Sequence, residues 1–140
     1  MKASLSLLSD PTELRRMIGF AERFARRHAL PSAERARLLI ILEELFTNVA
    51  KHGYGSGAPP GNIEVALAFD GERLRIEFSD NGRPFDPLSV ALPNIDQPAV
   101  KRQIGGLGLR FLRSLANDTQ YSRDGDRNRL VLTRKILHPG

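Results

Sequence analysis

The chain has 140 residues, 41% of them hydrophobic, which is enough to build one domain around one core. It contains no cysteine, which excludes a disulfide framework and a thiolate metal site, and its three scattered histidines argue against a zinc centre. The net charge of +5 admits a polyanion as partner, but the basic residues are spread along the chain without a dense run, so an arginine-rich solvated surface is the simpler interpretation.

The start of the chain carries no pattern typical of a signal peptide, because residues 1–8 hold one lysine and only a very short apolar run. No apolar stretch approaches the ~18 residues that a membrane span needs. We therefore expect a single cytoplasmic domain over residues 1–140, with no membrane and no direct nucleic-acid partner.

The first part of the chain predicts a strand followed by two helices. Residues 2–8 alternate weakly and indicate a short strand. Asp10 and Pro11 indicate a helix start, with aspartate as N-cap and proline at the first helical position, and apolar residues then recur at helical spacing as far as Leu30. Ser32 can cap a second helix that runs to about His52, where glycines and prolines end it.

Two β-hairpins are predicted further along. Residues 63–69 and 74–78 alternate strictly on either side of an Asp-Gly pair, which is a strong hairpin signal. Residues 119–123 and 129–137 flank a second hairpin at Asp124-Gly125-Asp126.

A long segment separates the two hairpins. Residues 83–104 hold four of the nine prolines and show no clean period, which is typical of a functional lid in so small a domain. Residues 109–116 then predict a third helix. The resulting order, β-α-α-β-β-loop-α-β-β, favours an α+β fold: a two-layer α/β sandwich with a mixed, largely antiparallel sheet and helices on one face.

The second predicted helix carries polar residues beside its apolar side. On a helical wheel, Glu44 and Asn48 lie about 40° apart at one edge of the apolar arc, and Lys51 lies about 20° from Glu44. Glu43 lies beyond the other edge. The arc itself is formed by Leu38, Leu42, Leu45, Phe46 and Val49.

This column of side chains allows two interpretations. One is a solvated helix face. The other is a magnesium–phosphate site, in which the Asn48 oxygen is a hard ligand, the Glu44 carboxylate accepts a proton and Lys51 meets phosphate.

Two glycine-containing stretches bear on this choice. Asp80-Asn81-Gly82 follows a predicted strand, where a carboxylate can accept a hydrogen bond from an exocyclic amine such as that of adenine, although such a sequence is also a common turn. GGLGLRFL, residues 105–112, leads glycines into a helix whose free N–H groups can bind an anion. It lacks the lysine of a P-loop and does not lie in a parallel βαβ unit, so neither of those nucleotide sites is supported.

Together and in this order, the three stretches resemble the nucleotide-binding boxes of the GHKL ATPase superfamily, and most closely those of its stand-alone anti-sigma-factor serine kinases. EELFTNVAKHGYG (43–55) resembles their N box, SDNGRPFDP (79–87) the first glycine box, and IGGLGLRFLRSLAND (104–118) the second. The closing NRLVLTRK (128–135) resembles their last strand. The resemblance implies the GHKL fold, ATP or ADP as ligand, and Mg²⁺.

The resemblance also implies roles for individual residues. Asn48 would be the Mg²⁺ ligand and Glu44 the general base for the acceptor serine. Asp80 would bind the adenine amine, with Gly82 packed against the ring. Residues 86–104 would be the ATP lid. The further nucleotide-binding positions would be Lys51, His52, Gly105, Gly106, Leu107, Gly108, Leu109 and Thr133.

These further positions differ in what they would do. Gly106 and Gly108 would bring backbone to the phosphates, while Lys51 and His52 fit the N box with less defined roles. Thr133 could reach the adenine edge from the final strand, although an ordinary strand threonine is the simpler interpretation.

Family members of this type hold a sigma factor inactive and phosphorylate an anti-anti-sigma protein of the STAS fold, so both classes of protein are the implied partners. The resemblance leaves open whether the chain forms a homodimer. These 140 residues contain no phospho-acceptor histidine domain, which argues against a complete sensor histidine kinase.

Three functional hypotheses follow. The first is an ATP-dependent serine-protein kinase that is also an anti-sigma factor, which the presence of Glu44 favours. The second is a nucleotide-responsive partner switch without significant kinase activity, which mixing with ATP and a STAS partner would distinguish. The third is a basic nucleic-acid binder, whose DNA affinity would fall steeply with salt.

Overall fold

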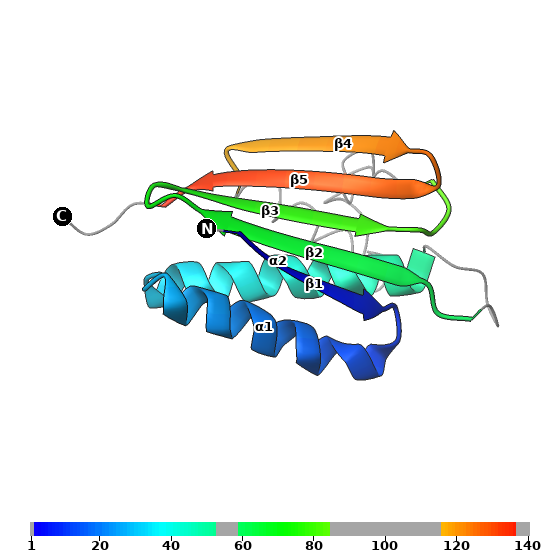
Figure 1. Ribbon diagram of the computed structural model, residues 1–140, viewed down its shortest axis with the longest axis horizontal. Coiled ribbons are helices and arrows are strands. Elements are labelled where there is room, and N and C mark those ends of the chain that lie inside the picture. Colours follow the sequence, from blue (N-terminus) through cyan, green and yellow to red (C-terminus); the bar gives the residue numbers. More distant parts are fainter. Residues whose placement is uncertain (1, 53–58, 85–115, 137–140) are drawn as a thin grey trace, which may run out of the picture.

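The computed structural model of the protein describes residues 2–52, 59–84 and 116–136. Figure 1 shows a sheet with two helices lying along one of its faces. The elements in chain order are β1 (Lys2–Leu8), a 3-10 turn (Pro11–Glu13), α1 (Leu14–Arg27), α2 (Ser32–His52), β2 (Asn62–Phe69), β3 (Arg73–Asp80), β4 (Asp118–Asp124) and β5 (Arg127–Lys135). The predicted strands and first two helices are confirmed, whereas the predicted third helix and the lid lie outside the described residues.

The start of the first helical segment shows the predicted cap with one refinement. The Asp10 carboxylate accepts a hydrogen bond from the backbone N–H of Thr12 at 2.9 Å, and Pro11 occupies the first position. The first turn is a 3-10 turn, and α1 proper begins at Leu14. The predicted N-cap is therefore confirmed, and the α-helix begins one turn later than the pattern suggested.

The end of α1 is a left-handed turn built without glycine. Ala29 has a φ of 51°, its N–H reaches the Arg26 carbonyl at 3.2 Å, and the N–H of Leu30 reaches the Ala25 carbonyl at 2.9 Å. This pair of bonds is the Schellman arrangement, which satisfies the last carbonyls of a helix. It turns the chain sharply, so that α2 can begin at Ser32 and pack beside α1.

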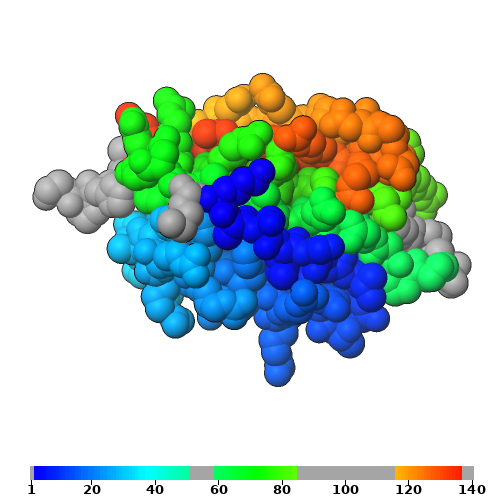
Figure 2. All heavy atoms as spheres, in the orientation of Figure 1, coloured from blue at the N-terminus to red at the C-terminus, as the bar shows by residue number. Residues whose placement is uncertain are grey.

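The sheet has the strand order β1-β2-β3-β5-β4, and every described pair is antiparallel. The largely antiparallel sheet is therefore confirmed, whereas the parallel pair implied by a mixed sheet is not found among these strands. Both hairpins turn at glycines with positive φ, Gly71 at 97° and Gly125 at 62°, where a side chain would be strained. Figure 2 shows the edge strand β1, in dark blue, at the surface between α1 and the other strands.

The core lies between the sheet and the helices. Alternate residues of the inner strands are buried, and they form one cluster with the apolar sides of both helices. On α2 the predicted arc is confirmed: Leu38, Leu42, Leu45 and Phe46 are at most 3% exposed, and Val49 is half-buried. In the described part of the chain, no helix combines the length and apolar character that crossing a membrane requires.

A buried ion pair fixes the start of α2 to the end of β5. Both Arg134 Nε and Nη2 donate to the Glu34 carboxylate, at 2.7 and 3.0 Å, and Arg37 donates to it at 2.8 Å. The Glu34 side chain is only 8% exposed. The hydrogen bonds from Arg134 hold the pKa of Glu34 below its ordinary value, against the opposing effect of burial.

The C-terminal end of α2 lies at the opposite end of the sheet from this ion pair. Figure 1 shows the last turns of α2 at the same end of the molecule as the end of β3 and the start of β5. The described parts of the N-box stretch (43–52) and of the first glycine stretch (79–84) thus share one end of the fold.

Candidate functional site

Glu44 and Asn48 form a contact pair on α2. Asn48 is 6% exposed, and its side-chain amide donates to the Glu44 backbone carbonyl at 2.7 Å and to Glu44 Oε1 at 3.1 Å. Glu44 is half-buried, whereas Glu43 beside it is exposed. The wheel prediction that Glu44 and Asn48 are neighbours at the edge of the core is confirmed.

Both bonds use the amide nitrogen of Asn48, so the oxygen Oδ1 takes part in neither. An amide oxygen is a ligand that Mg²⁺ accepts, and Mg²⁺ commonly completes its shell with water and substrate phosphate. Among the described residues there is no group of three His, Cys, Asp or Glu side chains that could hold a metal alone. Asn48 therefore fits a metal ion that arrives with a phosphate-bearing ligand.

The second part of the site is centred on Asp80, the last residue of β3. It is 4% exposed and lies in phase with the buried residues Phe78 and Ile76. Its Oδ1 accepts hydrogen bonds from the backbone N–H of Gly82 at 2.9 Å and from the Asn128 amide at 3.1 Å. Oδ2 takes part in neither bond, so this carboxylate has one oxygen fixed by the protein and one left to accept from a ligand.

The loop after Asp80 is tied to the neighbouring strands. Arg123 on β4 donates to the carbonyl of Gly82 at 2.7 Å, and Asn128 on β5 donates to the carbonyl of Arg83 at 2.8 Å. Gly82 itself is buried. Two strands therefore hold the backbone of Gly82 and Arg83 in place beside Asp80.

The sequence interpretation missed Asn128, Tyr121 and Arg123. Asn128 is 5% exposed and pairs directly with Asp80 across β3 and β5, and the Tyr121 hydroxyl donates to Asn128 Oδ1. A signal for Asn128 was present, because it alternates in phase with the buried Leu130 and Leu132. A polar side chain on the buried face of a strand needs a partner.

Thr133 is not part of this group. It pairs with Arg75 rather than Asp80, and its place in the alternation of β5 puts it on the face opposite to Leu132. It lies five positions beyond Asn128 along the strand, or roughly 16 Å away. This placement matches an ordinary strand threonine.

Several predicted site residues lie partly or wholly outside the described part of the chain. Lys51 and His52 are the last two residues of α2, but their side chains are not among those described. The glycine-rich stretch of Gly105, Gly106, Leu107, Gly108 and Leu109 and the segment 86–104 lie outside the described residues. Their roles stay predictions.

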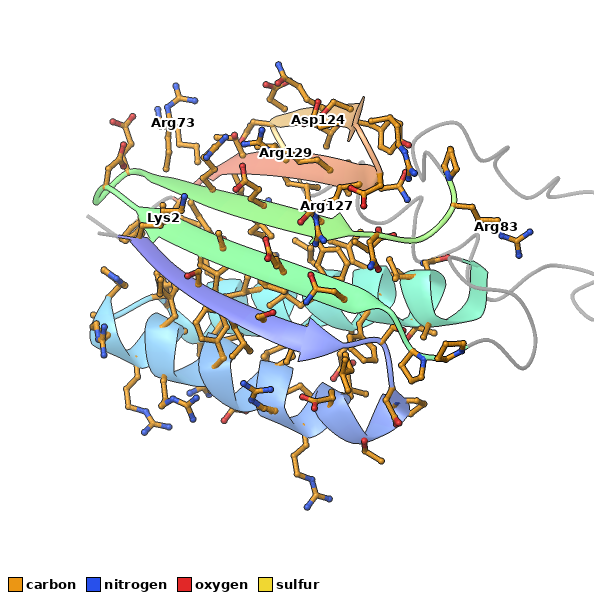
Figure 3. All side chains as sticks on the ribbon, turned by 45° about the vertical axis from the view of Figure 1, so that its right-hand side comes forward. Lys2, Arg73, Arg83, Asp124, Arg127 and Arg129 are labelled. Carbon is orange, nitrogen blue, oxygen red and sulfur yellow. The ribbon has the colours of Figure 1, made fainter. Side chains whose placement is uncertain are left out.

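The sheet face turned away from α1 and α2, which no described helix covers and which is called the uncovered face below, carries several charged side chains. A shallow hollow of about 470 Å³ there is lined in part by Lys2, Glu64, Glu77, Asp124, Arg127 and Arg129. Figure 3 shows Lys2, Arg127 and Arg129 on the side of the sheet turned away from the helices.

Two of the acids on this face, Glu77 and Asp124, are paired with arginines. Arg129 donates a hydrogen bond to the Glu77 carboxylate, and Arg75 lies 3.4 Å from the same carboxylate. The Asp124 carboxylate lies 3.9 Å from the Arg129 guanidinium. Carboxylates thus interrupt the positive charge of this face. None of the three carboxylates named in the lining of the hollow is buried, in contrast to that of Asp80. Asp80 forms a group, called the Asp80 cluster, with Asn128, Tyr121 and Arg123.

Comparison with known proteins agrees with the fold. The family described as histidine kinase-like ATPase domain matches residues 7–134. The chain is 31% identical over 91 residues to the serine-protein kinase RsbW of Listeria monocytogenes, covering 62% of this chain and 57% of that protein. It is 32% identical over 89 residues to RsbW of Bacillus cereus, covering 61% and 54%.

The chain thus spans little more than half of the length of these curated relatives. Its fold is similar to the crystal structure of the RsbU and RsbW domains of Rv1364c from Mycobacterium tuberculosis, with a TM-score of 0.70 at 16% identity. That similarity covers 99% of this chain and 33% of the other. Because the family match extends over nearly all of the described fold, the chain belongs to the histidine kinase-like ATPase domain family.

Proposed function

We propose that the protein is an ATP-dependent serine-protein kinase that also acts as an anti-sigma regulatory factor in a partner-switching system. The observation that carries this proposal is the pairing of a half-buried carboxylate, Glu44, with a buried carboxamide, Asn48, at the same end of the fold as the Asp80 cluster. The match to an ATPase domain family and the similarity to RsbW kinases support it.

Membership of an ATPase domain family implies that the site takes ATP or ADP. In our proposal Asp80 Oδ2 accepts from the exocyclic amine of adenine, and Gly82 lies against the ring. Asn48 Oδ1 would be the protein ligand of Mg²⁺. The metal would neutralise charge on the transferring phosphoryl group. The glycines at 106 and 108 are proposed, from the sequence alone, to approach the phosphates.

The chemical step needs one proton acceptor from the protein. The oxygen of an acceptor serine forms a bond to the γ-phosphorus, the bond from that phosphorus to the bridging oxygen of ADP breaks, and the serine proton passes to Glu44. The hydrogen bond from Asn48 to Glu44 Oε1 orients the carboxylate and leaves Oε2 to receive the proton. Glu44 thus contributes to transfer rather than to holding the nucleotide.

The partners in this proposal are a STAS-type anti-anti-sigma protein, which carries the acceptor serine, and a sigma factor, which is held inactive. The similarity to RsbW kinases supports this assignment. The competing function, a nucleotide-responsive binding switch without kinase activity, would use the same nucleotide site and the same partners.

Transfer of label from γ-labelled ATP to each STAS-type protein encoded in the same genome tests the proposal. Glu44→Ala should slow transfer by about 10²–10⁴-fold, which is the usual contribution of a general base, while ADP affinity stays unchanged. Glu43→Ala is the matched control, because Glu43 is exposed on the neighbouring position, and it should transfer at the normal rate.

The outcomes separate the two functions. Full-rate transfer by the Glu44→Ala variant would reject Glu44 as the base. ADP binding and STAS capture by the unmodified protein, without transfer to any of these partners, would reject the kinase and favour the binding switch.

A further inference from the structure

The Asp80 carboxylate is the end of a hydrogen-bonded chain of three side chains that crosses three strands. The Tyr121 hydroxyl on β4 donates to Asn128 Oδ1, and the Asn128 amide on β5 donates to Asp80 Oδ1 on β3 at 3.1 Å. Asp80 and Asn128 are each at most 5% exposed, and Tyr121 is half-buried. Buried polar groups in such a chain fix one another's orientation.

Tyr121 decides which way the Asn128 amide faces. A carboxamide can present either its NH₂ or its oxygen, and only the NH₂ can donate to the Asp80 carboxylate. Because the Tyr121 hydroxyl donates to Oδ1, the oxygen faces Tyr121 and the NH₂ faces Asp80. The same NH₂ also reaches the carbonyl of Arg83, so that both of its hydrogens are used.

The consequence for Asp80 is a carboxylate with one defined free oxygen. The Asn128 amide and the N–H of Gly82 both donate to Oδ1, which prevents the carboxyl group from rotating without losing two hydrogen bonds. Oδ2 is left as an acceptor in a fixed direction. An acceptor in a fixed direction selects a ligand that places a donor there.

We propose that Asn128, held by Tyr121, is the positioning residue through which Asp80 distinguishes a 6-amino purine from a 6-oxo purine. This inference rests on the proposed nucleotide site. Adenine places an N–H donor against Oδ2, whereas hypoxanthine and guanine place an acceptor oxygen there. Without Asn128 the carboxyl group can turn, and the difference between the two ring types shrinks.

The test compares the dissociation constants of ADP and inosine diphosphate, which differ at this purine position, by calorimetry. Asn128→Ala should weaken ADP binding by roughly tenfold, the effect of a lost buried hydrogen bond of about 1.4 kcal/mol, with little change for inosine diphosphate. Tyr121→Phe should reduce the preference by a smaller factor, and Asn128→Thr, which keeps one donor, should retain part of it.

Asn62→Ala is the matched control. Asn62 begins β2 at the same end of the sheet, but its side chain donates to Ser6 and not to Asp80. This variant should keep the full preference for ADP. The ratio of the two constants is the decisive quantity, because a variant that merely loosens the fold weakens both nucleotides alike.

The outcomes are distinct. An unchanged ratio in folded Asn128→Ala, or an equal weakening of both nucleotides, overturns the inference while leaving the nucleotide site intact. If Asn128→Ala does not fold, the ratios of Tyr121→Phe and Asn128→Thr decide in the same way. If the unmodified chain binds neither nucleotide, the proposed function and the inference are both rejected.

Discussion

Replacing Asp80 with asparagine should reverse the hydrogen-bonding character of the purine site without disturbing the fold. The two protein donors at this position, the N–H of Gly82 and the Asn128 amide, both require an acceptor. An asparagine can satisfy both only by placing its oxygen toward them. Its NH₂ group then takes the place of Oδ2 and faces the ligand.

The magnitude follows from this geometry. The variant loses a hydrogen bond from the adenine amine to a charged acceptor and sets two donors against each other, which together cost about 2–4 kcal/mol. The dissociation constant of ADP should therefore rise roughly 30- to 700-fold. Inosine diphosphate, whose 6-oxygen can accept from the new NH₂, should bind as well as or better than before.

Calorimetry with both nucleotides is the assay, and chemical unfolding is the check on the fold. The free energy of unfolding should change by less than about 1 kcal/mol, because both internal hydrogen bonds are kept. Asp124→Asn, the same change at an exposed aspartate on the uncovered face, should leave both affinities unaltered. Unchanged ADP affinity in the Asp80→Asn variant would refute the assignment of this residue to the purine.

Three other predictions concern the metal ligand and the ion pair at the far end of α2. Asn48→Ala should abolish the dependence of ADP affinity on Mg²⁺ while preserving metal-free binding of ADP. Titration of the variant with ADP, with and without Mg²⁺, measures this dependence, and an undiminished effect of Mg²⁺ would contradict the assignment of Asn48 as the metal ligand. Arg134→Ala should lower the free energy of unfolding by about 2–4 kcal/mol, because the buried Glu34 carboxylate keeps only the weaker of its described partners, Arg37. Arg16→Ala removes an exposed ion pair and should lower the free energy of unfolding by less than about 0.5 kcal/mol. Equal losses in the two variants would refute the claim that the buried pair contributes more than the exposed one. Since the folded pKa of Glu34 lies below its ordinary value of 4.5, the stability that the ion pair contributes is present above about pH 4.5 and is lost as the pH falls through the folded pKa. Urea unfolding from pH 7 to 3 should therefore show that the stability difference between the unmodified protein and Arg134→Ala shrinks at the acid end. A difference that stays constant over this range would contradict the prediction.

Most of the described fold could be predicted because its signals are local. The alternation of β2 and β3, the Asp-Gly turn between them and the Asp10 cap each lie within about ten residues of sequence. The wheel likewise places Glu44 beside Asn48 because they are one helical turn apart. What the local pattern left unresolved was detail at the boundaries, such as the 3-10 turn before Leu14.

The partners of Asp80 could not be predicted in the same way, because they depend on strand register. Asn128 lies 48 residues further along the chain, and only the pairing of β3 with β5 brings it opposite Asp80. The phase of β5 did contain a usable warning. Asn128 shares the buried face with Leu130 and Leu132, whereas Thr133, the residue that the sequence interpretation considered, is out of phase with them.

The most direct test of the central proposal is a crystal structure of the protein with ADP and Mg²⁺. We predict the adenine amine about 3 Å from Asp80 Oδ2, with the metal ion bound to Asn48 Oδ1 on the turn that carries Glu44. A nucleotide seated in the hollow on the uncovered face of the sheet, or one whose purine ring lies away from Asp80, would contradict the account.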